Sequence, residues 1–162
     1  KLRRRKALIP EKLPPLGVMI EVPAAAVAAD ALARASDFFA IGSNDLTMYT
    51  LAADRGNEHV AHLFDPLHPA VLRLIQSSTN SALKARIPIS ICGEIAGEPR
   101  YLPLLIGLGL RDLSMSPTAI PRVKQRIREL DALAAATRAN LIMDQTDSGR
   151  IATLLDDFNA LA

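Results

Sequence analysis

A short apolar run followed by a helix-like segment occurs four times between residues 16 and 130, and this alternation limits the possible folds more than any other feature of the sequence. It is typical of a parallel sheet whose strands are joined by helical crossovers. Each run is apolar along its length, which is typical of strands that are covered on both faces. The predicted strands are 16–22, 37–42, 87–92 and 112–116.

The segments that follow the apolar runs predict helices. The segment PAAAVAADALARA has proline in its first turn and alanine throughout, and HPAVLRLIQSSTNSALKAR has apolar residues at helical spacing. The stretch SNDLTMYTLAAD is expected to be a loop that opens a short helix, with Ser43, Asn44 or Asp45 as its cap. The expected helices are 23–35, 43–54, 68–86, 98–109 and 117–130, with one or two more in the remainder.

Two architectures fit four strand–helix units. The first is half of an eight-stranded barrel, since a complete barrel usually needs ~250 residues and this chain has 162. The second is a four-stranded doubly wound sheet, although no glycine-rich dinucleotide motif follows any strand. In either case the chain is expected to be one unit, with a helical lead-in at 1–15, four strand–helix units at 16–130 and C-terminal helices at 131–162.

Composition excludes several classes of function. The net charge is +2, from 19 basic and 17 acidic residues, so we expect no general affinity for nucleic acid or for membranes. The basic run KLRRRK is explained at least as well by a solvated helix end as by a polyanion site. A single cysteine cannot form an internal disulfide, which fits a cytoplasmic protein, and no apolar stretch has the length of a membrane span.

Polar side chains follow every predicted strand. In parallel α/β folds the carboxyl ends of the strands share one edge of the sheet, and chemistry gathers there. Carboxylates, an amide, a thiol and several hydroxyls are therefore expected on a common rim. The residues are Glu21 after the first strand, Ser43, Asn44 and Asp45 after the second, Cys92, Gly93 and Glu94 at the third, and Ser114 and Ser116 at the fourth.

Two carboxylates with an amide between them suit a hard divalent cation such as Mg²⁺, which leaves its other positions to water and substrate oxygens. The alternative for each residue is that it caps the next helix. Cys92 lacks the partners of a zinc site, because no second cysteine exists and the three histidines lie elsewhere. Its thiol is either an ordinary buried side chain or a reactive group, which could donate a proton as readily as attack.

Five motifs together resemble the phosphoenolpyruvate-binding domain of Enzyme I of the bacterial sugar phosphotransferase system. The wider family includes pyruvate phosphate dikinase and phosphoenolpyruvate synthase. The resemblance covers residues 16 to 130 and implies the second half, about strands 5 to 8, of a TIM (β/α)₈ barrel. The motifs are GVMIEVPAA, DFFAIGSNDLTMYTLAADRGN, DPLHPAVLRLI, ICGEIAG and LGLRDLSMSP.

The resemblance also implies roles. Glu21 and Asp45 match Mg²⁺ ligands, and Asn44, Asp45 and Arg55 match substrate-binding residues. Cys92 matches the general acid that protonates the enolate carbon. The implied reaction transfers the phosphoryl group of phosphoenolpyruvate to a histidine and releases pyruvate.

The chain also departs from the family pattern. Ser43 and Met48 stand where threonine and glutamine are common. The phosphate-binding arginines of the first strands and the phosphohistidine domain, which would serve a histidine phosphocarrier protein, have no counterpart. We therefore expect a homodimer that is inactive alone. A dikinase-like or synthase-like half-site and a non-catalytic module that senses phosphoenolpyruvate or dimerises are the alternatives.

Overall fold

The computed structural model describes residues 3–5 and 12–160, and in them the four predicted strands form one parallel sheet. The strands lie side by side in chain order, and each runs parallel to its neighbours. They are β1 (Gly17–Ile20), β2 (Phe38–Gly42), β3 (Ile89–Cys92) and β4 (Asp112–Leu113). β4 is shorter than the predicted 112–116, because only its first two residues pair with β3.

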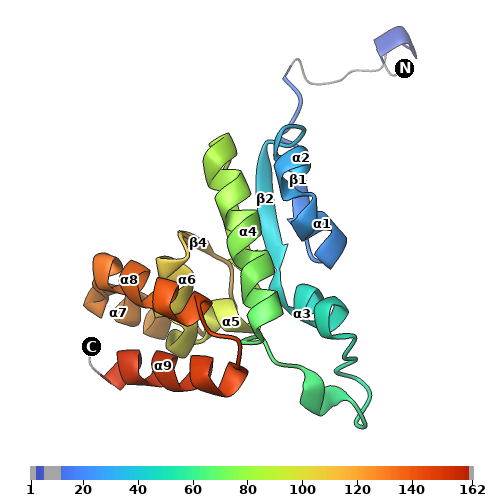
Figure 1. The fold of residues 1–162 in the computed structure, drawn as a ribbon. Coiled ribbons are helices and arrows are strands. Elements are labelled where there is room, and N and C mark those ends of the chain that lie inside the picture. The colour runs from blue at the N-terminus through green and yellow to red at the C-terminus, as the bar shows by residue number, and fades with distance from the viewer. Residues whose placement is uncertain (1–2, 6–11, 161–162) are drawn as a thin grey trace.

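The register brings the carboxyl ends of the strands to one edge of the sheet. Ile20 pairs with Ile41, and Gly42 pairs with Cys92, so β1, β2 and β3 end at nearly the same level. Helices α3 (Ser43–Leu51) and α5 (Glu94–Gly97) begin directly at this edge, at the lower end of the sheet in Figure 1. The residues that directly follow these strands in the sequence therefore lie at the same edge of the sheet.

The remaining helices connect the strands and continue past the last one. Helices α1 (Pro23–Val27) and α2 (Ala29–Ala33) follow β1, α4 (Pro69–Ala85) leads into β3, and α6 (Leu102–Gly107) leads toward β4. Helices α7 (Ile120–Glu129), α8 (Ala132–Met143) and α9 (Ser148–Ala160) complete the described chain. Short 3₁₀ turns are η1 (Arg3–Arg5), η2 (Ala61–Leu63) and η3 (Pro99–Tyr101).

Several predicted boundaries differ from those observed. The predicted helix 23–35 is two helices, because Ala28 leaves the helical conformation with ψ 10°. The predicted helix 98–109 starts as the turn η3 and becomes α-helical only at Leu102. Residues 12–15 of the expected helical lead-in are neither helix nor strand, and 1–2 and 6–11 lie outside the described residues.

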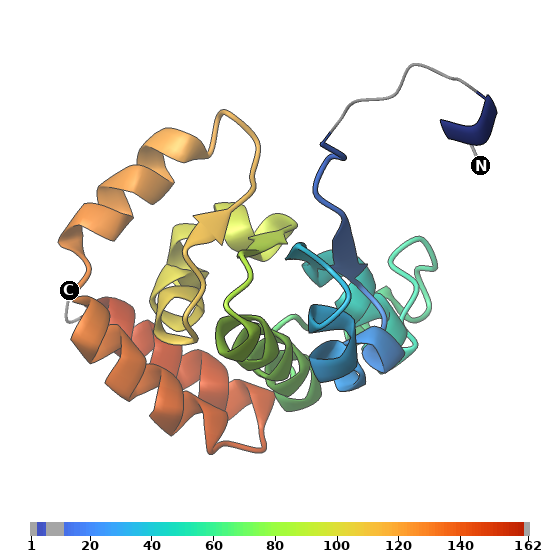
Figure 2. The ribbon, with the colours of Figure 1, turned by 90° about the horizontal axis from the view of Figure 1, so that it is seen from above.

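The sheet is covered by helices on one face only, which corrects the expectation of two covered faces. On the covered face Ile20, Phe39, Ile41 and Ile91 are almost fully buried. The alternate residues face the other side, where Met19 is 47% exposed and Phe38 38% exposed. Figure 2 shows α4 and α6 on one side of the row of strands. A doubly wound sheet would carry helices on both faces, so that alternative does not describe these residues.

Helices α8 and α9 pack against α6 beyond the sheet (Figure 1). The contact between α6 and α8 is close because Gly107 has no side chain, and a Cβ there would lie 2.6 Å from the Cβ of Ala139. Ala135 and Ala139 of α8 are buried, as are Ile151, Leu155 and Phe158 of α9. The C-terminal pair of helices is thus part of the hydrophobic core and not an appendage to it.

Candidate functional site

An open hollow of about 710 Å³ lies at the carboxyl edge of the sheet, beyond the ends of β3 and β4. It is formed by segments far apart in the sequence: the start of α3, the loop before α4, the β3–α5 turn, η3, the segment after β4 and the start of α7. Its lining residues are Asn44, Phe64, Pro66, Cys92, Gly93, Glu94, Ile95, Gly97, Glu98, Tyr101, Ser114, Met115, Ser116, Ala119 and Arg122.

Cys92 is the last residue of β3 and lines this hollow. Its neighbour Ile91 is fully buried on the helix-covered face, so the alternation of a strand turns Cys92 toward the open face. The thiol is half-buried, and its Sγ donates a hydrogen bond to the carbonyl oxygen of Ile41 at 3.4 Å. The structure therefore places the cysteine at the rim, while its catalytic role stays a prediction.

Gly93 forms the turn between β3 and α5, and its conformation requires glycine. Its φ is +104°, and a Cβ would collide with the hydroxyl of Ser43 and lie 3.0 Å from Oδ1 of Asn44. The Ser43 hydroxyl donates to the carbonyl of Cys92 at 2.6 Å, and the Glu94 amide donates to Oδ1 of Asn44 at 3.4 Å. Two polar contacts thus join the start of α3 to the turn after Cys92.

These contacts explain why the expected helix cap is wrong. Helix α3 begins at Ser43 itself, and its N-cap is Gly42, with no side-chain capping bond. The side chains of Ser43 and Asn44 bond across to the neighbouring turn instead. Asp45 lies within the first helical turn, where its negative charge is favoured by the partial positive charge of the helix N-terminus.

Arg55 reaches the site through a partner that the sequence did not suggest. Its Nη1 donates to Oε1 of Glu94 at 2.7 Å, and its guanidinium carbon lies 5.0 Å from the centre of the Phe64 ring. The Arg55 and Glu94 side chains are 37% and 73% exposed. Glu94 and Phe64 both line the hollow, so this ion pair holds the guanidinium beside it. The two residues are 39 positions apart in the sequence, so no local sequence pattern predicts that they pair.

The two carboxylates predicted to bind metal lie at the same edge, although neither lines the hollow. Glu21 follows β1, is half-buried, and places its Oε2 about 3.2 Å from where a Cβ on Gly42 would be. Its carboxylate therefore lies over the end of β2, close to the start of α3, whose first turn contains Asp45. Among the described residues, no three or more histidine, cysteine, aspartate or glutamate side chains cluster as a metal site.

The structure adds residues that sequence reasoning missed. Tyr101, Glu98 and Arg122 form one wall of the hollow, and Arg122 lies 3.9 Å from the carboxylate of Glu98. Arg122 is the third residue of a helix that is polar on its outer side, so nothing in the sequence separates it from a solvated charge. Ser114 and Ser116 line the hollow at the end of the fourth strand, as the strand-end argument expected.

A parallel sheet with an amide, a thiol and an arginine–glutamate pair around a hollow at its carboxyl edge has the architecture of α/β proteins that bind small molecules. None of the helices in residues 12–160 is long and apolar enough to cross a membrane. The fold and the hollow thus define the class of protein as a parallel α/β protein with polar side chains gathered at the strand ends.

Comparison with known proteins identifies the family. Residues 2–132 match the family described as PEP-utilising enzyme, PEP-binding domain, and the chain belongs to this family. It is 43% identical over 143 residues to the phosphoenolpyruvate-protein phosphotransferase of Haemophilus influenzae, an alignment of 88% of this chain and 25% of the relative. It is also similar to the Cupriavidus necator protein of the same name, at 52% identity over 112 residues, 69% of this chain and 19% of the relative.

A third relative is the multiphosphoryl transfer protein of Xanthomonas campestris, 55% identical over 114 residues, 70% of this chain and 14% of the relative. The chain thus spans a quarter or less of the length of these relatives.

Proposed function

We propose that this chain is the phosphoenolpyruvate-binding half-site of a phosphoenolpyruvate-protein phosphotransferase, an enzyme that moves the phosphoryl group of its substrate to a histidine and releases pyruvate. The observation that carries the proposal is that Asn44, Cys92 and Glu94 line one hollow at the strand ends, with Arg55 held beside it by Glu94. The similarity to phosphoenolpyruvate-protein phosphotransferases favours this function over the dikinase-like, synthase-like and non-catalytic alternatives.

Arg55 and Asn44 are the proposed substrate ligands, together with Asp45. A guanidinium offers a planar pair of donors that matches a phosphate or a carboxylate, which a lysine does not. Arg55 already lies beside the hollow through Glu94, at 2.7 Å, and an anionic substrate would compete with that glutamate for the same donors. Because the Arg55–Glu94 pair is partly exposed to solvent, replacing Glu94 by the substrate as the partner of Arg55 costs little free energy.

Cys92 is the proposed general acid. After the phosphoryl group leaves, the enolate of pyruvate needs a proton on its methylene carbon. The Sγ–H bond of Cys92 breaks and the carbon–hydrogen bond forms, which leaves a thiolate that solvent reprotonates. The half-buried thiol at the rim has a weak acceptor, the Ile41 carbonyl at 3.4 Å, so its proton is available to a substrate in the hollow.

Glu21 and Asp45 are the proposed ligands of a Mg²⁺ ion. The donor set fits, since Mg²⁺ takes one or two protein carboxylates and fills its other positions with water and substrate oxygens. Both residues lie at the carboxyl edge, and the Glu21 carboxylate extends over the end of β2 toward the start of α3. A bound Mg²⁺ supplies positive charge that offsets the charge developing during phosphoryl transfer.

The sheet is proposed to be the second half, about strands 5 to 8, of a (β/α)₈ barrel. Parallel sheets are normally covered on both faces, yet here the face with Met19 and Phe38 is open. A second set of strands would close the barrel and cover that face. The first half of the barrel would also supply further substrate ligands, and the histidine domain and a histidine phosphocarrier protein are the proposed partners of the complete cytoplasmic enzyme.

A test of the proposed function is Cys92→Ala in the complete phosphotransferase. We expect phosphoryl transfer to the histidine to persist in part, while pyruvate release falls by ~10²–10⁴-fold, the usual contribution of a general acid. Rapid-quench measurement of phosphohistidine and of pyruvate in the same samples separates the two steps. Pyruvate formation at the parent rate would leave Cys92 as a packing residue only.

The isolated chain offers a second test. With phosphoenolpyruvate and Mg²⁺ it should release no pyruvate above the uncatalysed rate, because the proposal places further substrate ligands and the phosphoryl acceptor outside these 162 residues. A coupled assay for pyruvate with the purified 162-residue chain measures this. Steady release of pyruvate would mean that this chain carries a complete active site.

A further inference from the structure

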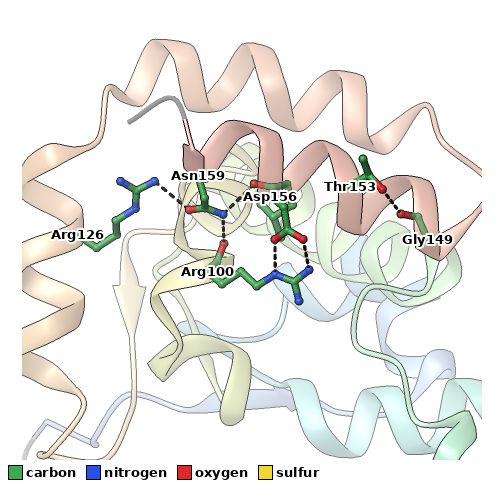
Figure 3. A network of polar contacts seen from close by, with 7 residues as sticks. Arg100, Arg126, Gly149, Thr153, Asp156 and Asn159 are labelled. Atoms are coloured by element: carbon green, nitrogen blue, oxygen red, sulfur yellow. Dashed lines mark hydrogen bonds and ion pairs between the residues drawn. The ribbon is translucent and has the colours of Figure 1, made fainter.

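Helix α9 lies outside the hollow, yet its side chains hold the segments that form one wall of it. None of its residues lines the hollow, and it lies beyond residues 2–132, the region that matches the family. The wall consists of Glu98 and Tyr101 around η3 and Arg122 near the start of α7. Between Glu98 and Tyr101 stands Arg100, which does not line the hollow and whose side chain reaches α9 (Figure 3).

Arg100 is fixed to α9 by two parallel hydrogen bonds. Its Nε donates to Oδ1 of Asp156 at 2.7 Å, and its Nη2 donates to Oδ2 at 2.9 Å. This fork-to-fork geometry sets the orientation of both planes and is stronger than a single contact. The hydrogen bond to Asp156 is also the main cause that raises the pKa of Arg100 above its usual value.

Asn159, one turn further along α9, joins the two segments that form the wall, η3 and α7. Its Nδ2 donates to the main-chain carbonyl of Arg100 at 3.0 Å and to the carbonyl of Leu155 in its own helix at 2.8 Å. Its Oδ1 accepts from Nη2 of Arg126 in α7 at 2.9 Å. Figure 3 shows the amide between Arg126 on one side and Arg100 on the other. Asn159 thus ties the backbone of η3 and a side chain of α7 to the same helix.

We propose that α9 is a positioning element of the hollow, in which Asp156 and Asn159 fix the wall formed by Glu98, Tyr101 and Arg122. This inference rests on the proposed function only for its consequence in catalysis. Arg126 stands one helical turn after Arg122 in α7, so the hydrogen bond from Arg126 to Asn159 restrains the part of the helix that carries Arg122. Apolar contacts of Ile151, Leu155 and Phe158 keep α9 docked, so loss of a polar tie loosens the wall and leaves the helix in place.

The test uses Cys92 as a reporter, because it is the only cysteine of the chain and lines the hollow. The rate at which a bulky aromatic maleimide modifies the native chain measures how far the wall limits access to the Cys92 thiol. We expect Asn159→Ala and Asp156→Asn to raise this rate by about three- to tenfold, as for a local opening, and the rate with small iodoacetamide to change much less. Asp156→Glu should restore part of the protection, since it keeps the carboxylate.

Two controls separate positioning from loss of stability. Asp157→Asn removes the same charge from the next residue of α9, which is exposed and makes no side-chain hydrogen bond or ion pair among the described residues. Its maleimide rate should equal that of the parent chain. Ile89→Val lowers stability from the amino end of β3, at the opposite edge of the sheet, and should leave the ratio of the two reagents unchanged.

The proposal is overturned if Asn159→Ala and Asp156→Asn leave the maleimide rate unchanged. It is also overturned if these variants raise the maleimide and iodoacetamide rates by the same factor, as Ile89→Val does. Should Asn159→Ala fail to fold, Asp156→Asn decides alone, because it leaves the contacts of Asn159 intact.

In the complete phosphotransferase the same substitutions should raise KM for phosphoenolpyruvate several-fold, while Asp157→Asn should not. A changed reagent ratio with an unchanged KM would keep the positioning role and count against the proposed function of the hollow.

Discussion

At the scale of single residues, the site depends on the turn Cys92–Gly93–Glu94. Each residue makes a different contact: Cys92 accepts from the Ser43 hydroxyl through its carbonyl, Gly93 leaves room for that hydroxyl, and Glu94 binds Arg55. The cysteine is therefore placed at a strand end before a glycine because only a glycine turn lets the start of α3 approach so closely. Any side chain at Gly93 would push the amide of Asn44 away from the hollow.

Gly93→Ala is accordingly expected to destabilise the chain by about 1–3 kcal/mol, the cost of a strained backbone conformation, increased by the collision with Ser43. Urea unfolding followed by circular dichroism measures this. Gly56→Ala is the control, since a Cβ there would meet only the side chain of Asp54, at 3.2 Å, which can turn aside. Equal stability of the two variants would contradict the account of this turn.

At the scale of elements, the C-terminal helices are held to the sheet through α6. Gly107 of α6 lies against α8, and the added Cβ of an alanine would lie 2.6 Å from Ala139 Cβ and closer still to the main chain of Ala135. Backbone cannot yield as a flexible side chain does, so α8 would have to move away from α6. Because α9 contacts both α8 and η3, such a shift would reach the wall of the hollow.

Gly107→Ala should therefore lower the free energy of unfolding by about 1–3 kcal/mol, as overpacking does, although alanine is the better helix former. The matched variant is Gly149→Ala in α9, where the substitution is exposed and should be neutral or raise stability by up to about 1 kcal/mol. Thermal unfolding of both variants gives the comparison. A Gly107→Ala variant as stable as the parent chain would show that α6 and α8 are less tightly packed than described.

At the scale of the whole molecule, the open face of the sheet is the main feature to explain. It carries apolar side chains, among them Met19 and Phe38, and Leu16 next to β1 is 68% exposed. Parallel strands with one uncovered face are unusual, and within residues 3–5 and 12–160 β1 and β4 each leave one edge unpaired. An exposed apolar surface beside free strand edges favours association with another chain.

We expect the isolated chain to be an oligomer at micromolar concentration, most simply a dimer. Light scattering coupled to size exclusion measures its mass against the 17.4 kDa of one chain. Phe38→Asp, on the open face, should shift the mass toward that of a monomer, whereas an exposed substitution on the helix side, such as Leu133→Asp, should not. A monodisperse monomer of the parent chain would contradict this expectation.

The sequence determined the local structure well, because strand and helix signals are short-range. The apolar runs predicted all four strands, and helical spacing predicted α4 within one residue at each end. It also placed the polar residues at the carboxyl edge, since parallel strands bring their ends together whatever their partners are. The break at Ala28 was not predictable, because no glycine or proline marks it and the neighbouring alanines favour a helix.

Only the tertiary structure decided how these residues meet. The pairing of Arg55 with Glu94, the approach of Ser43 to Gly93 and the ties from Asn159 to Arg100 and Arg126 join residues 33 to 59 positions apart. The open face was not predictable either, because Met19 and Phe38 look the same in the sequence whether or not a second layer covers them. Contacts between distant segments are set by the packing of whole elements, and a local pattern carries no record of that packing.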